Sequence, residues 1–277
     1  MGGLIQTGAQ AARHYDDHDV WYRALWGDRL HHGLWQAGVR DAREASERLL
    51  RTVADAAGLA PGVRVCDVGC GYGGPARWFA GQTGAEVVAV TNSVKQAAFA
   101  RAATTDPRIS IVHADWLEND LPTGAFGVAL ALESLAHFAD PARAVAEMAR
   151  VVKPGGRLVV AGWMAGEVVP GWAKRRLLGP IRRTGESPGL AGEVEHRCWF
   201  AAAGCRGIEV ARFGGQVGRT WSVALAGAAK ALLTDRMLLA EALRHPRRSL
   251  RLAASALRIR LAYHCGWLDY GVFTATR

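Results

Sequence analysis

The sequence predicts an α/β protein with a Rossmann-like, doubly wound sheet. Three observations support this fold class: strand-like apolar runs alternate with helical segments between residues 63 and 163, a glycine-rich stretch follows the first run, and half of the 277 residues are apolar. Alternating strands and helices are typical of a parallel sheet covered on both faces. Because a chain of this length can bury one large core, we expect one integrated catalytic domain.

The N-terminal region is predicted to be helical. Apolar residues recur every three or four positions in residues 12–27 and again in residues 38–59, which is the period of amphipathic helices. Gly58 and Pro61 are residues that stop helices. We expect residues 1–58 to form a helical lid.

The central region, residues 59–164, is predicted to hold most of the sheet. Its strand-like runs are short, rich in β-branched residues and separated by helical or loop segments such as 73–82, 94–103 and 141–152. The runs are VRVCDVG (63–69), AEVVAVT (85–91), ISIVHAD (109–115), FGVALALES (126–134) and GRLVVAGW (156–163).

The remaining segment, residues 165–277, is predicted to complete the sheet and to carry a helical cap inserted before the last strand. It contains, in order, a basic stretch rich in glycine and proline (165–192), a helix (193–204), a strand (207–213), a helical insertion (about 217–262) and a final strand (270–277).

Positive charge is concentrated in this C-terminal segment. Residues 1–170 hold 16 Lys and Arg against 18 Asp and Glu, whereas residues 171–277 hold 18 against 7. Such asymmetry indicates an anionic ligand or partner. The run from 244 to 260 has the pattern of an amphipathic basic helix. Its apolar stripe is Leu250, Ala254, Leu257 and Leu261, and its basic stripe is Arg244, Arg251 and Arg258.

Several roles for this basic helix stay open. It could be a solvated outer face, bind an anionic group of a small molecule, touch an acidic membrane surface or meet an acidic carrier protein. Nucleic acid is not expected, because the sequence holds no recognised nucleic-acid-binding module.

Composition also limits the compartment. Five cysteines lack CxxC spacing, which argues against a zinc cluster or a disulfide framework and favours a reducing cytosol. The N-terminus lacks a secretory pattern, and no apolar run approaches the roughly 20 residues that span a membrane. We expect a cytoplasmic protein that does not span the membrane, although peripheral contact with a membrane stays open.

The glycine-rich stretch VCDVGCGYGGPARWFA (65–80) predicts a ligand site. Gly69, Gly71 and Gly74 satisfy the dinucleotide pattern GxGxxG, so an NADP-dependent reductase with Lys95 near the phosphate stays open. Asp67, two residues ahead, suits a ligand with an ammonium group better than a pyrophosphate. The second strand ends without the acidic residue that would bind an NAD ribose.

Several ordered motifs together resemble the class I S-adenosylmethionine-dependent methyltransferases. They are the glycine stretch, VVAVTNSVKQAAFA (87–100), VHADWLENDLP (112–122), residues 126–163 and YGVFTATR (270–277). The chain resembles in particular the branch that contains gamma-tocopherol methyltransferase and bacterial natural-product methyltransferases. The resemblance implies a seven-stranded sheet with an antiparallel last strand and S-adenosylmethionine as cofactor.

The resemblance also implies which residues bind that cofactor. Asp67 and the loop glycines would lie at its methionine part, polar residues after the second strand at its ribose, and Asp115 with Trp116 at its adenine. A tyrosine of the leading helices would close over it. The full set is Asp67, Gly69, Gly71, Gly73, Thr91, Asn92, Ser93, Gln96, Asp115, Trp116, Glu133 and Tyr15.

Catalytic candidates follow the fourth strand, where ligands bind in open α/β sheets. Glu133 and His137 lie four apart and would share a face if this segment turns helically. His137 is the preferred general base, because imidazole titrates near neutral pH. Glu133 could orient His137, deprotonate a carbocation or brace the loop. Nothing marks a metal site.

The acceptor is expected to be a hydrophobic small molecule of natural-product metabolism (prenyl or terpenoid, polyketide or aromatic), with or without an anionic group, methylated on carbon or oxygen. The predicted pocket residues are Tyr22, Trp26, His32, Trp163 and Trp172, although the loop that holds His32 could simply be solvated. A cyclase on the same fold and a non-catalytic binding protein are further alternatives, since a fold does not fix a function.

Overall fold

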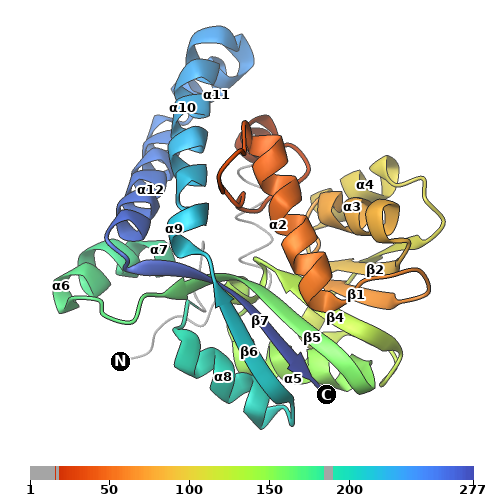
Figure 1. Ribbon diagram of the computed structural model, residues 1–277. Coiled ribbons are helices and arrows are strands. Elements are labelled where there is room, and N and C mark those ends of the chain that lie inside the picture. The colour runs from red at the N-terminus through yellow and green to blue at the C-terminus, as the bar shows by residue number, and fades with distance from the viewer. Residues whose placement is uncertain (1–15, 17–18, 184–189) are drawn as a thin grey trace.

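The computed structural model describes residue 16 and residues 19–183 and 190–277. Its centre is a seven-stranded sheet in the order β3-β2-β1-β4-β5-β7-β6 (Figure 1). The first five strands along the chain pair in parallel, and β7 is antiparallel to both β5 and β6. The predicted fold class is therefore confirmed. The strands are β1 (Arg64–Val68), β2 (Glu86–Thr91), β3 (Ile109–His113), β4 (Phe126–Leu132), β5 (Val152–Ala165), β6 (Arg206–Arg212) and β7 (Leu268–Thr276).

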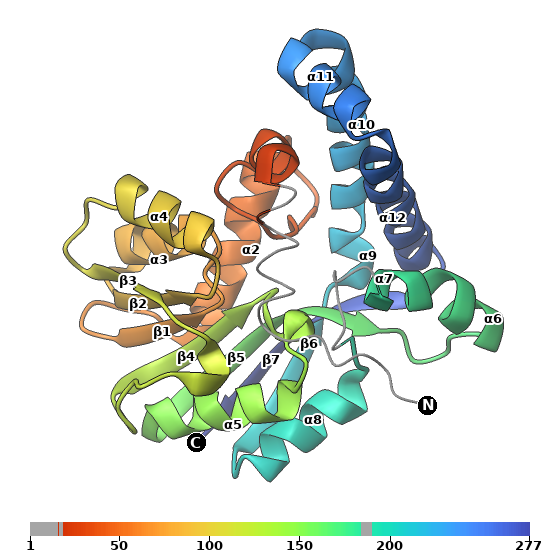
Figure 2. The same cartoon turned by 180° about the vertical axis from the view of Figure 1, so that it is seen from behind.

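Helices cover both faces of the sheet (Figures 1 and 2). Along each buried strand, alternate side chains pack into the hydrophobic clusters on the two opposite faces of the sheet. On β4, Val128 and Leu130 join the cluster with α2, α3 and the base of the cap, while Ala129 joins the cluster with α5 and α8. The covering helices are α2 (Ala42–Ala57), α3 (Gly74–Thr83), α4 (Val94–Ala103), α5 (Pro141–Val151) and α8 (Glu193–Ala202).

The local sequence explains where these helices begin and end. The side chains of Asp41, Ser93 and Asp140 accept backbone hydrogen bonds at the first turns of α2, α4 and α5, which satisfies donors that have no partner inside the helix. Gly58 ends α2 in the left-handed conformation (φ 64°), as its helix-stopping character predicts.

The helical insertion forms a cap that projects from the body (Figure 2). It consists of α10 (Arg219–Thr234), α11 (Arg236–Arg244) at its far end and α12 (Pro246–His264), which returns to β7. The short elements between these parts are η1 (Trp116–Glu118), η2 (Leu135–His137), α6 (Gly171–Ala173), η3 (Lys174–Leu178), α7 (Gly179–Arg183) and α9 (Gly214–Val217).

The predicted apolar stripe of α12 does not face the core. Leu250, Leu257 and Leu261 are 70%, 54% and 44% exposed, whereas Ser255 and Ile259 are buried. The helix packs through small and branched side chains on the opposite face, and hydropathy alone could not distinguish the two faces. None of the described helices combines the length and apolar character needed to cross a bilayer.

Candidate active site

The glycine-rich stretch forms a tight loop between β1 and α3. Gly69, Gly71 and Gly73 all have positive φ values, 79°, 56° and 74°, a region that side chains with a Cβ atom rarely adopt. A Cβ on Gly69 would collide with Ser134, whereas one on Gly71 would meet nothing within 4 Å. The loop therefore needs glycine at position 69 to pack and leaves open space beside position 71.

A first cavity, called here the glycine-loop cavity, lies at the carboxyl ends of β1, β2 and β4. This is the edge where open α/β sheets bind ligands. Its lining is backbone-rich on the side of the loop and polar on the side of β2. The residues from these elements are Asp67, Gly69, Cys70, Gly71, Pro75, Val90, Thr91, Asn92, Gln96, Leu132, Glu133, Ser134, His137 and Phe138, with Leu30, His31, Ala114 and Trp116 beside them.

Asp67 lines this cavity and has an unsatisfied carboxylate oxygen. The residue is 1% exposed, and its Oδ2 has no hydrogen-bond partner in the described part of the chain. Burial raises the pKa of Asp67 to about 7, because the charged form loses its hydration. A buried oxygen of this kind is suited to a cationic ligand group.

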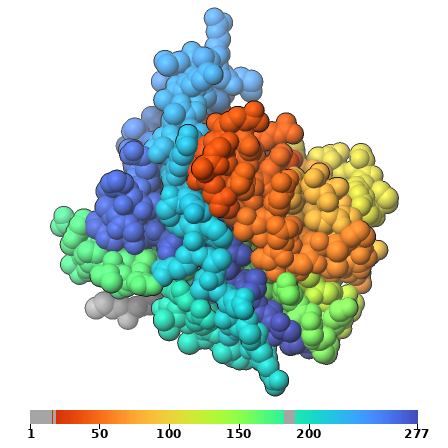
Figure 3. Space-filling model, in the orientation of Figure 1, coloured from red at the N-terminus to blue at the C-terminus, as the bar shows by residue number. Residues whose placement is uncertain are grey.

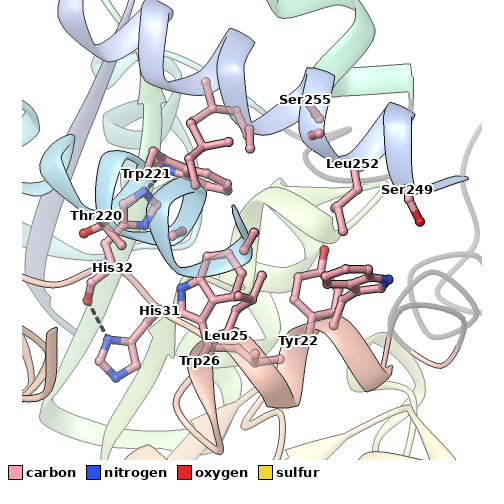
Figure 4. Close-up of a pocket in the computed structure, with 18 of the residues that line it drawn as sticks. Tyr22, Leu25, Trp26, His31, His32, Thr220, Trp221, Ser249, Leu252 and Ser255 are labelled. Atoms are coloured by element: carbon pink, nitrogen blue, oxygen red, sulfur yellow. Dashed lines mark hydrogen bonds between the residues drawn. The ribbon is translucent and has the colours of Figure 1, made fainter. Parts of the chain in front are cut away.

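A second cavity, the cap cavity, lies between the N-terminal residues 21–32 and the inner faces of α10–α12 (Figure 4). It encloses an empty volume of about 1190 Å³, part of which is open to solvent. Aromatic and aliphatic side chains form most of its wall. Among them are Trp21, Tyr22, Leu25, Trp26, Trp163, Trp221, Leu225, Ala228, Leu232, Leu252 and Ile259.

The two cavities meet at shared residues. Leu30, His31, Glu133 and His137 line both of them. A ligand in one cavity would thus contact the same side chains as a ligand in the other. Two ligands, one in each cavity, would therefore lie next to each other at the end of β4.

Glu133 is held at this junction in an unusual backbone conformation. Its φ of 55° makes it the non-glycine residue with positive φ among the described residues. Oε1 accepts hydrogen bonds from the His32 backbone N–H (2.7 Å) and the Tyr270 hydroxyl (3.0 Å), and Oε2 accepts from His32 Nδ1 (2.8 Å) and Trp163 Nε1 (3.2 Å). Although burial raises the pKa of Glu133, the hydrogen bonds that the His32 ring and backbone N–H donate to its carboxylate lower the pKa.

The hydrogen bonds of His32 fix its tautomer. The Trp221 indole N–H, which can only donate, lies 2.7 Å from His32 Nε2, so this nitrogen is the acceptor. Nδ1 therefore carries the proton that is donated to Glu133, and the ring is neutral. His31 Nδ1 lies 2.7 Å from the His32 carbonyl oxygen and donates to it. Burial lowers the pKa of His31, which favours a neutral ring there as well.

The chain is similar in sequence to known methyltransferases. Residues 66–160 match the family model described as a methyltransferase domain. The 27-O-demethylrifamycin SV methyltransferase of Amycolatopsis mediterranei is 37% identical over 144 residues, which are 50% of this chain and 53% of that protein. A probable chloroplastic tocopherol O-methyltransferase of Oryza sativa is 34% identical over 163 residues, 54% of this chain and 45% of that protein. Residues 66–160 therefore carry a methyltransferase domain.

The likeness of fold extends beyond this methyltransferase domain. The crystal structure of the [4+2]-cyclase SpnF superposes on this chain with a TM-score of 0.82 and a sequence identity of 26%. The match covers 98% of this chain and 97% of the SpnF chain. The chain spans about half the length of the curated relatives it matches.

Most of the residues predicted to bind the methyltransferase cofactor surround the glycine-loop cavity, but three lie outside its lining. Gly73 is the N-cap of α3, and a Cβ there would meet Arg77 and Ala100. Ser93 is buried, caps α4 and donates a hydrogen bond to Asp16 at 2.6 Å. The predicted residues that do line the cavity are Asp67, Gly69, Gly71, Thr91, Asn92, Gln96, Trp116 and Glu133.

Asp115 is the third residue outside the lining. Its Oδ1 accepts the Leu117 backbone N–H at 3.0 Å and caps η1. The neighbouring Trp116 is buried, lines the cavity and donates to the Ala144 carbonyl at 3.0 Å. Tyr15 lies outside the described residues.

The predicted catalytic pair, Glu133 and His137, does not lie on the helical turn that the sequence suggested. After β4 the chain passes through the left-handed Glu133, and only Leu135–His137 form a short 3-10 helix. The Glu133 carboxylate is hydrogen-bonded to His32, Trp163 and Tyr270 rather than stacked one turn below His137. Both residues nevertheless line both cavities.

Four of the five predicted pocket residues line the cap cavity: Tyr22, Trp26, His32 and Trp163. The fifth, Trp172, does not, since it is 52% exposed on α6 and packs edge-on against Trp267. The loop that holds His31 and His32 is not solvated, because both rings are at most 4% exposed.

Sequence reasoning counted Trp221 among the tryptophans of an acceptor pocket or cap core, but it did not link Trp221 to His32 or Tyr270 to Glu133. Trp221 and Tyr270 come from α10 and β7, far along the chain from β4, and no local pattern links them to it. The adjacent pair His31-His32 was visible in the sequence, but its burial depends on contacts with distant aromatic residues such as Trp163 and Trp221.

Proposed function

We propose that this protein binds S-adenosylmethionine in the glycine-loop cavity and transfers its methyl group to a hydrophobic small molecule held in the cap cavity. The observation that carries the proposal is the junction of the two cavities at Glu133 and His137. Methyl transfer is an in-line displacement, so its rate depends mainly on alignment of the two reactants and exclusion of water.

The residues present fit the cofactor. The unsatisfied Oδ2 of Asp67 suits the ammonium group of the methionine part, and the open space beside Gly71 admits a ligand close to the backbone. Thr91 and Gln96, which hydrogen-bond to each other at 3.0 Å, offer polar atoms for the ribose. The indole of Trp116 is available for the adenine ring. When bound, the cofactor supplies an electrophilic methyl group.

The polar side chains at the junction have separate tasks. Glu133 already accepts four hydrogen bonds, so it is a poor proton acceptor. It acts instead as a fixed negative charge that favours cationic character near the reacting atoms. His137 is assigned as the general base that removes the proton of the acceptor.

The chemistry of the cap cavity indicates the acceptor class. Apolar lining such as Leu225, Leu252 and Ile259, with aromatic faces from Tyr22 and Trp26, suits a prenyl or terpenoid, polyketide or aromatic molecule. The names of the rifamycin and tocopherol methyltransferase relatives are in keeping with such acceptors. We extend the proposal to methylation on carbon or oxygen and to a cytoplasmic location, where the five free thiols would stay reduced.

Calorimetry and labelled-methyl transfer test this proposal. We expect S-adenosylhomocysteine to bind and NADPH not to bind; Lys95, the candidate for a phosphate contact, donates instead to the Asp16 carbonyl at 3.0 Å. Methyl transfer from labelled S-adenosylmethionine should fall at least about 100-fold in His137→Ala while cofactor affinity persists. Unchanged turnover would remove His137 from the role of base, and tight NADPH binding would contradict the cofactor assignment.

Cyclisation is the second candidate, favoured by the likeness to SpnF along nearly the whole chain. A cyclase would convert its substrate without consuming the cofactor. Mass spectrometry distinguishes the two functions, because methylation adds the mass of one CH₂ group to the product whereas cyclisation adds none.

A further inference from the structure

The far end of the cap carries exposed aliphatic side chains. Leu233, Met237, Leu243 and Leu250 are 87%, 78%, 72% and 70% exposed. They come from α10, α11 and α12 and define what we call the cap tip. Figure 3 shows this tip protruding beyond the rest of the molecule. Large aliphatic side chains gathered at one exposed place mark interaction sites.

Positive charge surrounds the cap tip. Residues 219–264 contain nine Lys and Arg but only two Asp and Glu. One acidic residue, Asp235, accepts the backbone N–H groups of Met237 and Leu238 as the N-cap of α11. The other acidic residue is Glu241, whose Oε1 lies 3.9 Å from His245 Nε2. Four exposed arginines flank the aliphatic side chains: Arg236, Arg244, Arg247 and Arg251.

The cap tip and the cap cavity are formed by the same three helices. Leu232, Ala242 and Ser249 line the cavity, and each precedes an exposed residue of the tip in the sequence. The cavity wall therefore reaches the protruding end of the molecule, as the position of Ser249 near the edge of the cavity also indicates (Figure 4).

From these observations we infer that the cap tip docks on an anionic lipid surface, from which the hydrophobic acceptor enters the cap cavity. Delivery of the acceptor rests on the proposed function, but docking does not. A second copy of this chain is disfavoured as the occupant, because two positively charged tips repel each other. A folded protein partner would need matched pockets for four side chains from three helices. A lipid surface accepts such side chains in any arrangement.

Vesicle flotation of the full-length protein tests the inference. The probes are vesicles of phosphatidylcholine alone and of phosphatidylcholine with phosphatidylglycerol, at low and high salt. We expect flotation with the anionic vesicles at low salt and its loss at high salt. Each arginine near an anionic surface contributes about fivefold in partitioning, so Arg244→Gln/Arg247→Gln should partition about 25-fold more weakly.

Matched controls separate the tip from general surface effects. Leu233→Ser/Met237→Ser should weaken partitioning at least about tenfold. Val168→Ser/Val194→Ser, at sites that are 83% and 72% exposed on the body, should leave it unchanged. Arg51→Gln/Arg206→Gln removes two exposed arginines outside the cap and should have an effect of less than about threefold, because lipid attraction falls off within a Debye length.

Three outcomes would overturn the inference: no flotation with any vesicle, equal flotation with neutral and anionic vesicles, or equal losses in tip and control variants. The first would favour an acidic protein as the partner of the cap. Binding of S-adenosylhomocysteine should be the same in all these variants. If the unmodified protein did not bind S-adenosylhomocysteine, the proposed function would be contradicted, but the flotation result would still decide whether the cap tip binds lipid.

Discussion

Replacing Asp67 by Asn tests the cofactor site through its pH dependence. Burial raises the pKa of Asp67 to about 7, so the carboxyl is protonated below that pH and ionised above it. In the proposed site, the ammonium group of the ligand pairs with the ionised carboxylate. Because the α-amino group of the ligand itself titrates near pH 8, it stays mostly charged as the solution is acidified from neutral pH. Affinity should therefore fall as pH falls through 7.

The size of this effect follows from the ionised fraction of Asp67. With a pKa of about 7, that fraction drops about 25-fold between about pH 7.5 and about pH 5.5. Calorimetric titration with S-adenosylhomocysteine should show this loss in the unmodified protein. Asp67→Asn should bind as weakly at both pH values as the unmodified protein does at the lower one.

The same carboxylate should also affect the stability of the ligand-free protein. A group whose pKa is raised on folding stabilises the folded state fully below its unfolded pKa of 3.8, and this contribution is lost as pH rises through the folded pKa of about 7. Ionised and buried, Asp67 costs up to about 4 kcal/mol. Asp67→Asn should therefore raise the Tm at about pH 8 in the absence of ligand. A flat affinity profile in the unmodified protein, or a variant that titrates in the same way, would refute the assignment.

Three further substitutions test the site. Glu133→Gln should destabilise the fold by about 1–3 kcal/mol in thermal denaturation. In either orientation its amide NH₂ would face a group that can only donate, the His32 backbone N–H or the Trp163 indole N–H. An unchanged Tm would contradict the hydrogen-bond network. Gly69→Ala should abolish S-adenosylhomocysteine binding in calorimetry, whereas Gly204→Ala, with the same φ of 79° but open space around it, should retain it. Ala228→Trp should fill the cap cavity and lower labelled-methyl transfer at least about tenfold, with cofactor affinity retained. The control Ala229→Trp, at an exposed position, should leave methyl transfer unchanged. Equal activity in both variants would count against the cap cavity as the acceptor site.

The fold could be predicted because its signals are local. Strand runs, the glycine loop and the stop at Gly58 each involve few consecutive residues, and parallel pairing brings the carboxyl ends of β1, β2 and β4 to one edge. Residues at the carboxyl ends of these strands, such as Asp67, Thr91 and Glu133, could therefore be assigned to one cavity from the sequence.

The remainder of the site depends on contacts between distant segments. Tyr270 reaches Glu133 only because β7 inserts beside β5, and Trp221 reaches His32 only because α10 covers the lid residues. The error at Trp172 has the same origin, since a tryptophan on a short helix gives no sign of which side it faces. The sequence did not fix which face of α12 is buried, because this helix has one apolar face in the wall of the cap cavity and another that is exposed.

The hydrogen bonds of Glu133 connect the segments that line the two cavities. A left-handed conformation at a non-glycine residue costs on the order of 1–3 kcal/mol and persists only where the surroundings enforce it. Here donors from the N-terminal loop, β5 and β7 converge on one carboxylate, and α10 is joined to them through Trp221 and His32. The N-terminal loop, β5, β7 and α10 are therefore tied to the end of β4, which also lines the glycine-loop cavity. Loss of the bond between Trp221 and His32 would remove the donor to His32 Nε2 and so weaken the connection between α10 and Glu133.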